Sequence, residues 1–394
     1  MVLEYRVAWI RGAGVTEQVF SSFTWYSPTK VIFGVGRRSE LASVVDDTAG
    51  SGAHVFLVTG RRSLRAQGIT QQVIDSLGPE RVTLFDEVTP FPSPALVDRA
   101  LDACRRSSAE VVVAVGGGSP MDVAKSVAIL TTHDGSSVEF ATGRRDFQRA
   151  GLPFVAVPTT SGSSSEVTSG AALWDIEAKR SMALSSPLMF PTAAIVDPEL
   201  AMTMSKSLAA ASGMDAFTSA FESYWSLDSE PIADALDLDV IRMFAANLER
   251  SCIEGDLESR SACALAAIVS GIAYSNSHPN VCHAVGSPLT IFWGADHGQA
   301  VGITLSTFLR WSAPAITHKL PALWEALGVS GMDEASARID QIMERCGLET
   351  RLRGLGLKET DMETLVENIR WDRTDVLPRS LDRRDAAELL GRLM

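Results

Sequence analysis

An unbroken apolar run, Val111–Val115, leads directly into the glycine turn Gly116–Ser119 and limits the folds open to this chain. Because every position of the run is apolar, it is typical of a strand buried on both faces of a parallel sheet. A helical pattern, Met121–Leu130, follows the glycines. Glycine lets backbone approach a phosphate group closely, and free N–H groups at a helix start favour its negative charge. The glycines alone leave two interpretations open, a phosphate site or a tight turn without ligand, since they do not form a G-x-G-x-x-G string.

Short apolar and β-branched runs recur in the first half of the chain, at Val55–Val58, Val82–Phe85, Phe154–Val157 and Ala193–Val196. A helical stretch covers about Ala95–Ser107, and three prolines between Val88 and Pro94 predict an extended loop before it. Strands that alternate with helices predict βαβ units and a doubly wound parallel sheet.

The composition changes after about Asp197, where Ala, Leu, Met and Glu recur at helical spacing with few β-branched clusters. We therefore expect an α/β domain with a Rossmann-like parallel sheet over residues 1–200 and an all-helical domain over residues 201–394. Ligands of such proteins bind in the cleft between domains and at the carboxyl ends of the strands.

The composition disfavours several classes of function. A net charge of −13 argues against nucleic-acid binding, which needs clustered Lys and Arg. The N-terminus holds Glu4, Arg6 and Arg11 without a long apolar run, so we expect no secretory signal. No stretch reaches the roughly 20 apolar residues that cross a bilayer. The cysteines show no CxxC spacing, which fits free thiols in a reducing, cytoplasmic compartment. They are Cys104, Cys252, Cys263, Cys282 and Cys346.

The string GGGSPMDVAK, from Gly116 to Lys125, resembles the signature of the iron-containing (group III) alcohol dehydrogenases. Other motifs of that family occur in the right order, at Ile32–Gly36, Pro158–Thr168, Asp197–Leu200, Gly213–Ala216, His283 and His297. The resemblance covers nearly the whole chain. It implies the dehydroquinate synthase-like fold of that family, with a dinucleotide-binding α/β domain and a helical metal and substrate domain.

The resemblance also implies where a nicotinamide dinucleotide binds. The glycine turn would bind the pyrophosphate, with Asp122 and Lys125 helping to fix the turn, and the loop after the next strand would contact the adenosine or pyrophosphate side. The expected cofactor contacts are Gly60, Arg61, Gly116, Gly117, Gly118, Ser119, Asp122, Thr159, Thr160, Ser163 and Lys179.

The residue after the second strand bears on the choice between NAD and NADP. NAD-preferring relatives often have an aspartate there, which can bind both ribose hydroxyls and repel a 2′-phosphate. This chain has Gly60, followed by Arg61 and Arg62. The missing acid and the neighbouring cations favour NADP. Use of NAD stays open, as does the alternative that both arginines face solvent.

The resemblance further implies one divalent metal ion, which the family holds with an aspartate and three histidines. Asp215, His283 and His297 match three of these ligands and are the expected catalytic residues. Ser219 occupies the fourth position, one helical turn after the aspartate on the same face. Serine is a poor ligand, so two alternatives follow. The remaining three residues hold Fe²⁺ or Zn²⁺ with an open position, as related glycerol dehydrogenases are held to do, or the site is empty or weakly occupied.

A second departure from the family is Ser287, where many relatives have a histidine that is often proposed to relay a proton. His278, in the string Ser-His-Pro, could take that role. The alternative is that it is an exposed loop histidine.

Several motifs resemble the phosphonoacetaldehyde reductase branch, namely Leu173–Asp175, Glu222–Trp225, Tyr274–Asn276, Ser287–Thr290 and Asp372–Asp375. That branch reduces phosphonoacetaldehyde to 2-hydroxyethylphosphonate in phosphonate biosynthesis. A phosphonate needs cationic or N–H partners, and the candidates are Lys179, Arg180, His278, Arg373 and Arg379, each of which could instead be an ordinary surface side chain. The branch usually keeps the histidine that Ser219 replaces, so another small aldehyde or ketone is an alternative substrate.

Three functions follow from the sequence. The first is an NAD(P)H-dependent reductase of a small aldehyde, acting in the interdomain cleft with a metal that polarises the carbonyl. The second is a polyol or secondary-alcohol dehydrogenase of the glycerol-dehydrogenase type. The third is a degenerate homologue that binds nucleotide without catalysis, which the intact glycine turn disfavours. We expect a homodimer that binds neither nucleic acid nor membranes.

Overall fold

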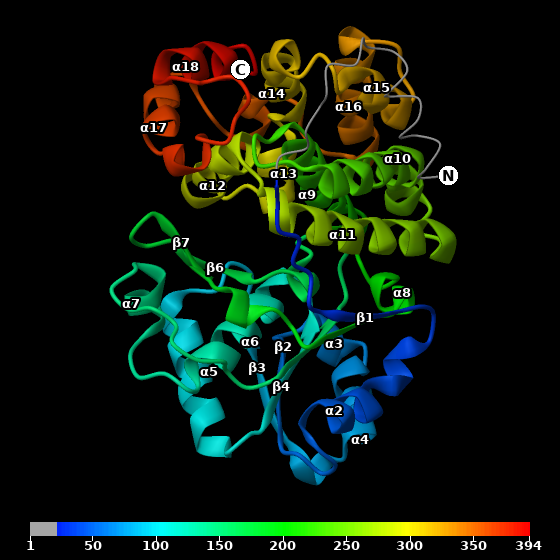
Figure 1. The fold of residues 1–394 in the computed structure, drawn as a ribbon, viewed down its shortest axis with the longest axis vertical. Helices are drawn as coiled ribbons and strands as arrows, with labels where there is room; N and C mark the ends of the chain where they lie inside the picture. The colour runs from blue at the N-terminus through cyan, green and yellow to red at the C-terminus, as the bar shows by residue number, and fades with distance from the viewer. Residues whose placement is uncertain (1–21) are drawn as a thin grey trace.

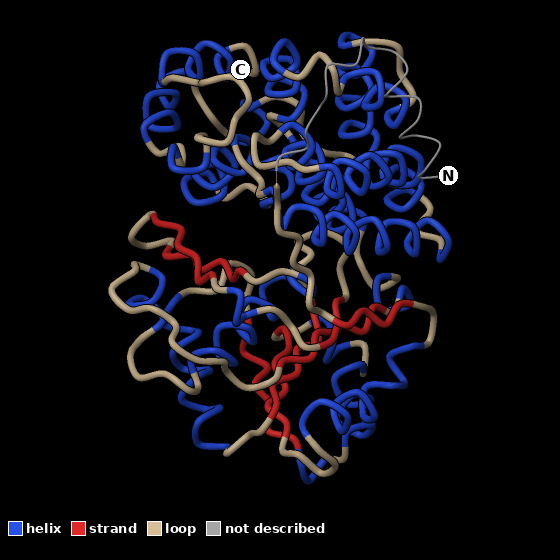
Figure 2. Tube along the Cα trace, viewed as in Figure 1, coloured by secondary structure: helices blue, strands red, loops and turns tan. Residues whose placement is uncertain are grey.

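The computed structural model describes residues 22–394, which form an α/β lobe and a helical lobe (Figure 1). Glu4, Arg6 and Arg11, which carry the prediction about a secretory signal, lie outside the described residues. The strands gather in the α/β lobe, and the other lobe consists of helices and loops (Figure 2). Within residues 22–394, no helix has the length and apolar character needed to cross a membrane.

Six parallel strands form the main sheet in the order β1-β8-β5-β4-β2-β3. They are β1 Lys30–Phe33, β2 Val55–Gly60, β3 Val82–Val88, β4 Val111–Gly116, β5 Phe154–Pro158 and β8 Ala193–Val196. Val113 of β4 lies between Leu57 and Val155 of its two neighbours. The whole of β4 is buried, which confirms the strand and the parallel sheet predicted from its apolar run.

Helices cover both faces of this sheet because successive strand side chains point to opposite sides. Val113 packs with α2 (Leu41–Ala49) and α4 (Ile69–Leu77) in one core cluster. Val112 packs with α5 (Pro94–Ser107) and α6 (Gly118–Leu130) in the other. Burial of each such valine contributes about 1.5–3 kcal/mol. This two-sided packing holds the carboxyl ends of β2, β4 and β5 at one edge, where the glycine turn lies.

The second lobe is helical, as predicted. Its helices are α8 Pro198–Ala201, α9 Lys206–Trp225, α10 Pro231–Ile253, α11 Leu257–Ser277, α12 Val281–Trp293, α13 His297–Gly302, α14 Leu305–Ser312, α15 Leu320–Leu327, α16 Met332–Cys346, α17 Met362–Glu367 and α18 Arg383–Gly391. Helix α9 packs against α10, α11 and α13 and is buried along most of its length. The boundary at residue 200 stays a prediction.

A two-stranded antiparallel hairpin, β6 (Gly170–Asp175) and β7 (Arg180–Ser185), was not predicted. It projects from the α/β lobe toward α12 (Figures 1 and 2). Lys179 lies in the turn of the hairpin with a φ of 52°. The hairpin contributes one wall of the cleft described next.

Candidate active site

A cleft of about 1030 Å³ lies between the two lobes. The carboxyl ends of β2, β4 and β5 line one side, and α9, α12 and the start of α13 line the other. It brings together most residues singled out in the sequence, namely Gly60, Arg61, Gly116, Gly117, Gly118, Ser119, Asp122, Thr159, Thr160, Ser163, Asp215, Ser219, His278, His283, Ser287, His297 and Arg373.

The glycine turn forms a cradle with no room for side chains. A Cβ on Gly116 would lie 2.7 Å from Cγ of Pro120, and one on Gly118 would lie 2.9 Å from Oγ of Ser163. The φ of Gly116 is 157°, which also disfavours other residues. Helix α6 begins at Gly118, so its unpaired N–H groups face the cleft. The turn therefore fits the phosphates of a dinucleotide.

A buried polar network ties α6 to the loop after β5. Lys125 Nζ donates to Ser165 Oγ at 2.9 Å and to the Gly170 carbonyl at 2.7 Å. Ser165 Oγ donates to Asp122 Oδ1 at 3.1 Å. Burial raises the pKa of Asp122 and lowers that of Lys125. These contacts join α6, which begins in the glycine turn, to the loop after β5.

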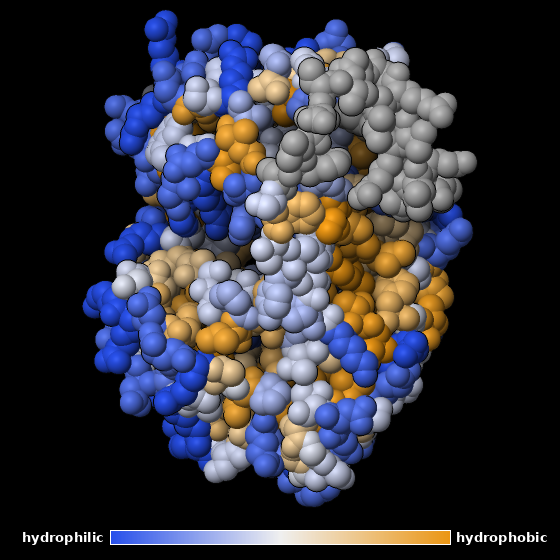
Figure 3. All heavy atoms as spheres, in the orientation of Figure 1, coloured by the Kyte–Doolittle hydropathy of each residue, from blue (hydrophilic) through white to orange (hydrophobic). Residues whose placement is uncertain are grey.

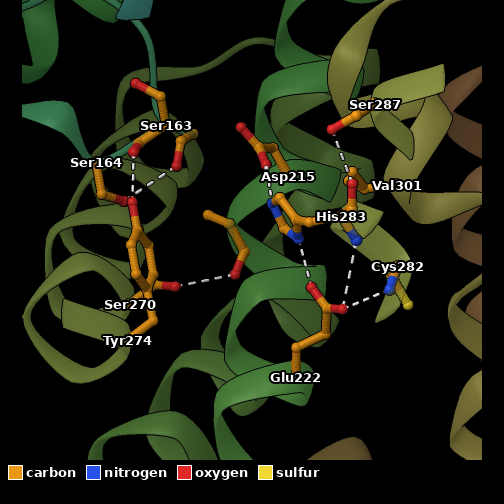
Figure 4. A network of polar contacts seen from close by, with 12 residues as sticks. Ser163, Ser164, Asp215, Glu222, Ser270, Tyr274, Cys282, His283, Ser287 and Val301 are labelled. Carbon is orange, nitrogen blue, oxygen red and sulfur yellow. Dashed lines mark hydrogen bonds and ion pairs between the residues drawn. The ribbon is translucent and has the colours of Figure 1, made fainter. Parts of the chain in front are cut away.

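The candidate metal ligands Asp215, His283 and His297 come from α9, α12 and α13 and converge on one point. One donor atom from each lies within 4.8 Å of the other two. His283 Nε2 lies 3.2 Å from Asp215 Oδ1 (Figure 4). Nδ1 of His297 is buried without a hydrogen-bond partner in the structure. A carboxylate and two imidazoles are suitable ligands for Fe²⁺ or Zn²⁺, so the cluster fits a divalent ion.

Burial and charge set the protonation states of this cluster. Burial lowers the pKa of His297 to about 4, which keeps it in the neutral form that ligates metals. Burial opposes ionisation of Asp215, but the hydrogen bond from His283 holds the pKa of Asp215 below its usual value. Burial also disfavours the charged form of His283, whereas Glu222 and Asp215 raise the pKa of His283 to about 9.

Glu222 is a buried member of the site, to which the sequence assigned no role beyond its place in the motif Glu222–Trp225. Its carboxylate accepts hydrogen bonds from His283 Nδ1 and from the backbone N–H of Cys282, the latter at 2.5 Å (Figure 4). Holding the proton on Nδ1 leaves Nε2 of the imidazole turned toward Asp215. The sequence signal that could have identified Glu222 is its spacing, because it follows Asp215 by two turns on the same face of α9.

We expect Glu222→Gln to lower both metal affinity and kcat about 10- to 100-fold, the usual effect of losing a hydrogen-bonded partner of a metal-bound histidine. Glutamine keeps the shape of the side chain but loses the charge that holds the proton on Nδ1 of His283. Metal titration and steady-state kinetics measure the two effects. Glu254→Gln, the same change at the exposed end of α10, should alter neither. Unchanged metal affinity in Glu222→Gln would contradict the positioning role.

The two positions linked to proton transfer differ in their surroundings. Ser287 Oγ donates to the His283 carbonyl at 3.0 Å, within its own helix (Figure 4). The side chain of His278 is 67% exposed, and Nδ1 lies 3.9 Å from Asp228. Both residues line the cleft, but Ser287 is buried, whereas the side chain of His278 is largely exposed to solvent.

Three of the basic residues proposed as substrate contacts do not line the cleft. Lys179, also proposed as a cofactor contact, donates from Nζ to the Ile291 carbonyl at 3.0 Å. Arg379 stacks on the ring of Trp311 at 3.5 Å. Arg180 is exposed at the start of β7. The hairpin and the C-terminal segment therefore place these three side chains away from the cleft, and their role as substrate contacts stays a prediction.

Two arginines of the C-terminal segment do line the cleft. Arg370, which was not predicted, pairs with Asp372 through two hydrogen bonds of 2.9 and 2.7 Å. Arg373, by contrast, makes no side-chain hydrogen bond or ion pair with any of residues 22–394. Burial lowers its pKa, and the nearby Arg370 adds to this. Arg373 therefore presents a desolvated cation with open donors to the cleft.

Comparisons with known proteins agree with this geometry. The family model "Iron-containing alcohol dehydrogenase" matches residues 28–198, and the model "Fe-containing alcohol dehydrogenase family, C-terminal" matches residues 209–394. The chain is 32% identical over 367 residues to 1,3-propanediol dehydrogenase of Klebsiella pneumoniae, covering 88% of this chain and 92% of that protein. Lactaldehyde reductase of Escherichia coli K12 is 28% identical, covering 84% and 89%.

Solved structures show the same fold. Sulfoacetaldehyde reductase from Bifidobacterium kashiwanohense, determined in complex with NAD⁺, superposes with a TM-score of 0.89 at 28% identity, covering 95% of this chain and 99% of that one. A 1,3-propanediol oxidoreductase superposes with a TM-score of 0.88 at 30% identity, covering 95% and 100%. These matches confirm the predicted combination of a parallel-sheet domain and a helical domain.

Proposed function

The chain belongs to the iron-containing alcohol dehydrogenase family and is an oxidoreductase, and we propose that it reduces a small aldehyde with NAD(P)H in the interdomain cleft. One observation carries this proposal: the glycine cradle and the cluster of Asp215, His283 and His297 face the same cleft. When bound there, the dinucleotide would supply the hydride, and a divalent ion, Fe²⁺ or Zn²⁺, held by Asp215, His283 and His297 would polarise the carbonyl.

The protein's own residues bind and orient the reactants. The N–H groups of the glycine turn bind the pyrophosphate, and Asp215, His283 and His297 hold the ion. Glu222 keeps the proton on Nδ1 of His283, so that Nε2 is available as a ligand. We propose that the product alcohol takes its proton from solvent by way of His278, which lines the cleft and has a largely exposed side chain.

We propose phosphonoacetaldehyde as the substrate. The unpaired guanidinium of Arg373 would bind the phosphonate through charge-assisted hydrogen bonds. The similarity to a sulfoacetaldehyde reductase supports an aldehyde with an anionic head group.

Loss of NADPH absorbance with phosphonoacetaldehyde, sulfoacetaldehyde and propionaldehyde tests this function. We expect kcat/KM for phosphonoacetaldehyde to exceed that for propionaldehyde by about 100-fold, equivalent to about 2.7 kcal/mol. A preference for oxidising polyols with NAD would favour the alternative dehydrogenase function, which the similarity to 1,3-propanediol dehydrogenase supports. No turnover of any carbonyl by metal-loaded protein would exclude reductase activity.

We further propose a preference for NADPH, and Gly60→Asp tests it. Gly60 does not have a positive φ, and an added Cβ would have only Pro120 within 4 Å, at 3.9 Å, so aspartate fits. Its carboxylate would repel the 2′-phosphate and offset the attraction of Arg61 and Arg62. We expect the KM for NADPH to rise at least about tenfold, or 1.4 kcal/mol, with little change for NADH. Gly60→Asn is the control, and an equal rise in both variants would contradict repulsion by charge.

A homodimer and a cytoplasmic location complete the proposal. Apolar side chains gather along α11 and the adjoining edge of the sheet (Figure 3), including the partly exposed Leu257 and Leu265. Among residues 22–394, strand β1 is the edge of the sheet there, and a second copy could cover that edge. Light scattering should give twice the chain mass of 42.2 kDa. All five cysteines are free, which suits a reducing compartment.

A further inference from the structure

The last turn of α11 contacts the loop that follows β5. Tyr274 Oη donates a hydrogen bond to the Ser163 carbonyl at 2.6 Å (Figure 4). Tyr274 lies on a helix of the helical lobe, whereas Ser163 lies between β5 and β6, so this bond crosses from one lobe to the other. Both residues line the cleft. The proposed reaction assigns the Tyr274 hydroxyl no step.

The same loop is packed tightly against α11 and α9. A Cβ on Gly271 of α11 would lie 2.4 Å from Cβ of Ser164. A Cβ on Gly162 would lie 2.5 Å from the carbonyl oxygen of Ser212 on α9. Ser164 has a φ of 51°, in the left-handed region, and its Oγ donates to the Ala267 carbonyl of α11 at 2.5 Å. Because serine rarely adopts this φ, the contacts with α11 hold the loop in its shape.

The loop also borders the glycine cradle. A Cβ on Gly118 would lie 2.9 Å from Oγ of Ser163, so the two residues are in direct contact. The loop thus lies between the turn that fits the pyrophosphate and α9, where Asp215 follows Ser212 by three residues. A shift of the loop against α11 would therefore move a bound nucleotide relative to the candidate metal ligands.

A second contact fixes the end of α11 on the α/β lobe. Asn276 Oδ1 accepts a hydrogen bond from the backbone N–H of Tyr26 at 3.0 Å, and Asn276 Nδ2 donates to the Tyr26 carbonyl at 3.3 Å. Tyr26 precedes β1, and its ring packs edge to face against Phe190 with the ring centroids 5.5 Å apart. Tyr274 and Asn276 therefore anchor one helical turn to two separate segments of the other lobe.

We propose that Tyr274 is a positioning residue, whose hydrogen bond to Ser163 sets the place of the nucleotide-binding loop and so aligns the nicotinamide with the substrate carbonyl. This inference rests on the proposed function. Hydride transfer needs reacting atoms held about 3–3.5 Å apart, and a misplacement of about 1 Å can lower the rate about 100-fold. A single hydrogen bond that fixes the loop can therefore affect kcat more than it affects stability.

Amide hydrogen exchange of the full chain tests the contact without turnover. Tyr274→Phe keeps the ring and loses the hydroxyl, so we expect amides of residues 159–168 to exchange about fivefold faster than in the wild type. Tyr224→Phe is the matched control, because the Tyr224 hydroxyl donates to the Lys319 carbonyl at 2.9 Å within the helical lobe. It should leave exchange in residues 159–168 unchanged. Equal exchange in this loop in the wild type and Tyr274→Phe would overturn the proposal.

Kinetics with NADPH deuterated at both C4 positions test the alignment. We expect Tyr274→Phe to lower kcat about 10- to 100-fold and to increase the deuterium isotope effect on kcat, because hydride transfer then limits turnover. The isotope effect does not depend on the fraction of folded enzyme, so a merely unstable variant leaves it unchanged. Affinity for Zn²⁺ should stay the same, since the Tyr274 hydroxyl is bonded to Ser163 rather than to a metal ligand. A wild-type kcat in Tyr274→Phe, or an equal loss in Tyr224→Phe, would overturn the proposal.

A second variant acts on the same loop from α11. Gly271→Ala adds the methyl group that would lie 2.4 Å from Cβ of Ser164. We expect it to speed exchange in residues 159–168 and to increase the isotope effect, as in Tyr274→Phe. An unchanged loop in Gly271→Ala would contradict the dependence of the loop on α11. A wild-type protein that turns over no carbonyl would instead exclude the proposed function, and the exchange experiment would still decide whether Tyr274 holds the loop.

Discussion

Replacing Asp215 with asparagine is expected to lower kcat about 10³-fold or more and to release the bound metal. Asparagine is close in size to aspartate, so α9 and its packing should persist. The variant loses the one carboxylate of the three-residue donor cluster and the acceptor 3.2 Å from His283 Nε2. Loss of carbonyl polarisation is worth several kcal/mol, and about 4 kcal/mol corresponds to this factor.

Metal analysis and kinetics should be combined with nucleotide binding to separate this effect from unfolding. The glycine cradle lies in the other domain, so the affinity for NADPH should change little in Asp215→Asn. Ser219→Ala is the matched control one turn along α9, and it should keep metal and kcat within about threefold because serine is a poor ligand. An Asp215→Asn protein that retains its metal and full kcat would exclude Asp215 as a ligand.

The main sheet could be predicted because the apolar pattern of its strands in the sequence matches their burial in the fold. Val111–Val115 is apolar at each position, and β4 is buried on both faces. The hairpin of β6 and β7 lacked such a signal. Its first strand starts Gly170-Ala171-Ala172, residues with weak strand preference, and several of its positions stay partly exposed. Its place is set by tertiary contacts with α6, α12 and α7 (Ser137–Ala141), which no local pattern reports.

Some residues of the candidate site could likewise be predicted from local sequence, whereas others depend on tertiary packing. Asp215, His283 and His297 were found through motifs that keep residue type and order. The role of Glu222 was missed because it depends on which face of α9 meets α12, a matter of helix packing. Arg370 was missed because its position depends on how the C-terminal segment folds back over the cleft. The positive charge of Lys179 suggested a ligand contact but did not show where its side chain lies. The hairpin turn directs that side chain to the Ile291 carbonyl.

Replacing Arg373 with glutamine is expected to lower kcat/KM for phosphonoacetaldehyde about 10- to 150-fold and to leave propionaldehyde almost unaffected. A hydrogen bond to a charged group contributes about 1.5–3 kcal/mol, which corresponds to that range. The effect should exceed that at Arg370, because Asp372 already holds the Arg370 guanidinium. The Arg373 guanidinium has no such partner within residues 22–394, so its charge is available to the substrate.

Competition between the two aldehydes in one assay measures this specificity directly, because enzyme concentration and fraction folded cancel in the ratio. Arg379→Gln is the matched control: it removes the same charge where the side chain stacks on Trp311 outside the cleft. Arg373→Lys should retain part of the preference, since lysine keeps the charge but not the paired donors of the guanidinium. Equal losses for both aldehydes in Arg373→Gln would mean that Arg373 shapes the cleft without recognising the anion, and the phosphonate assignment would then fail.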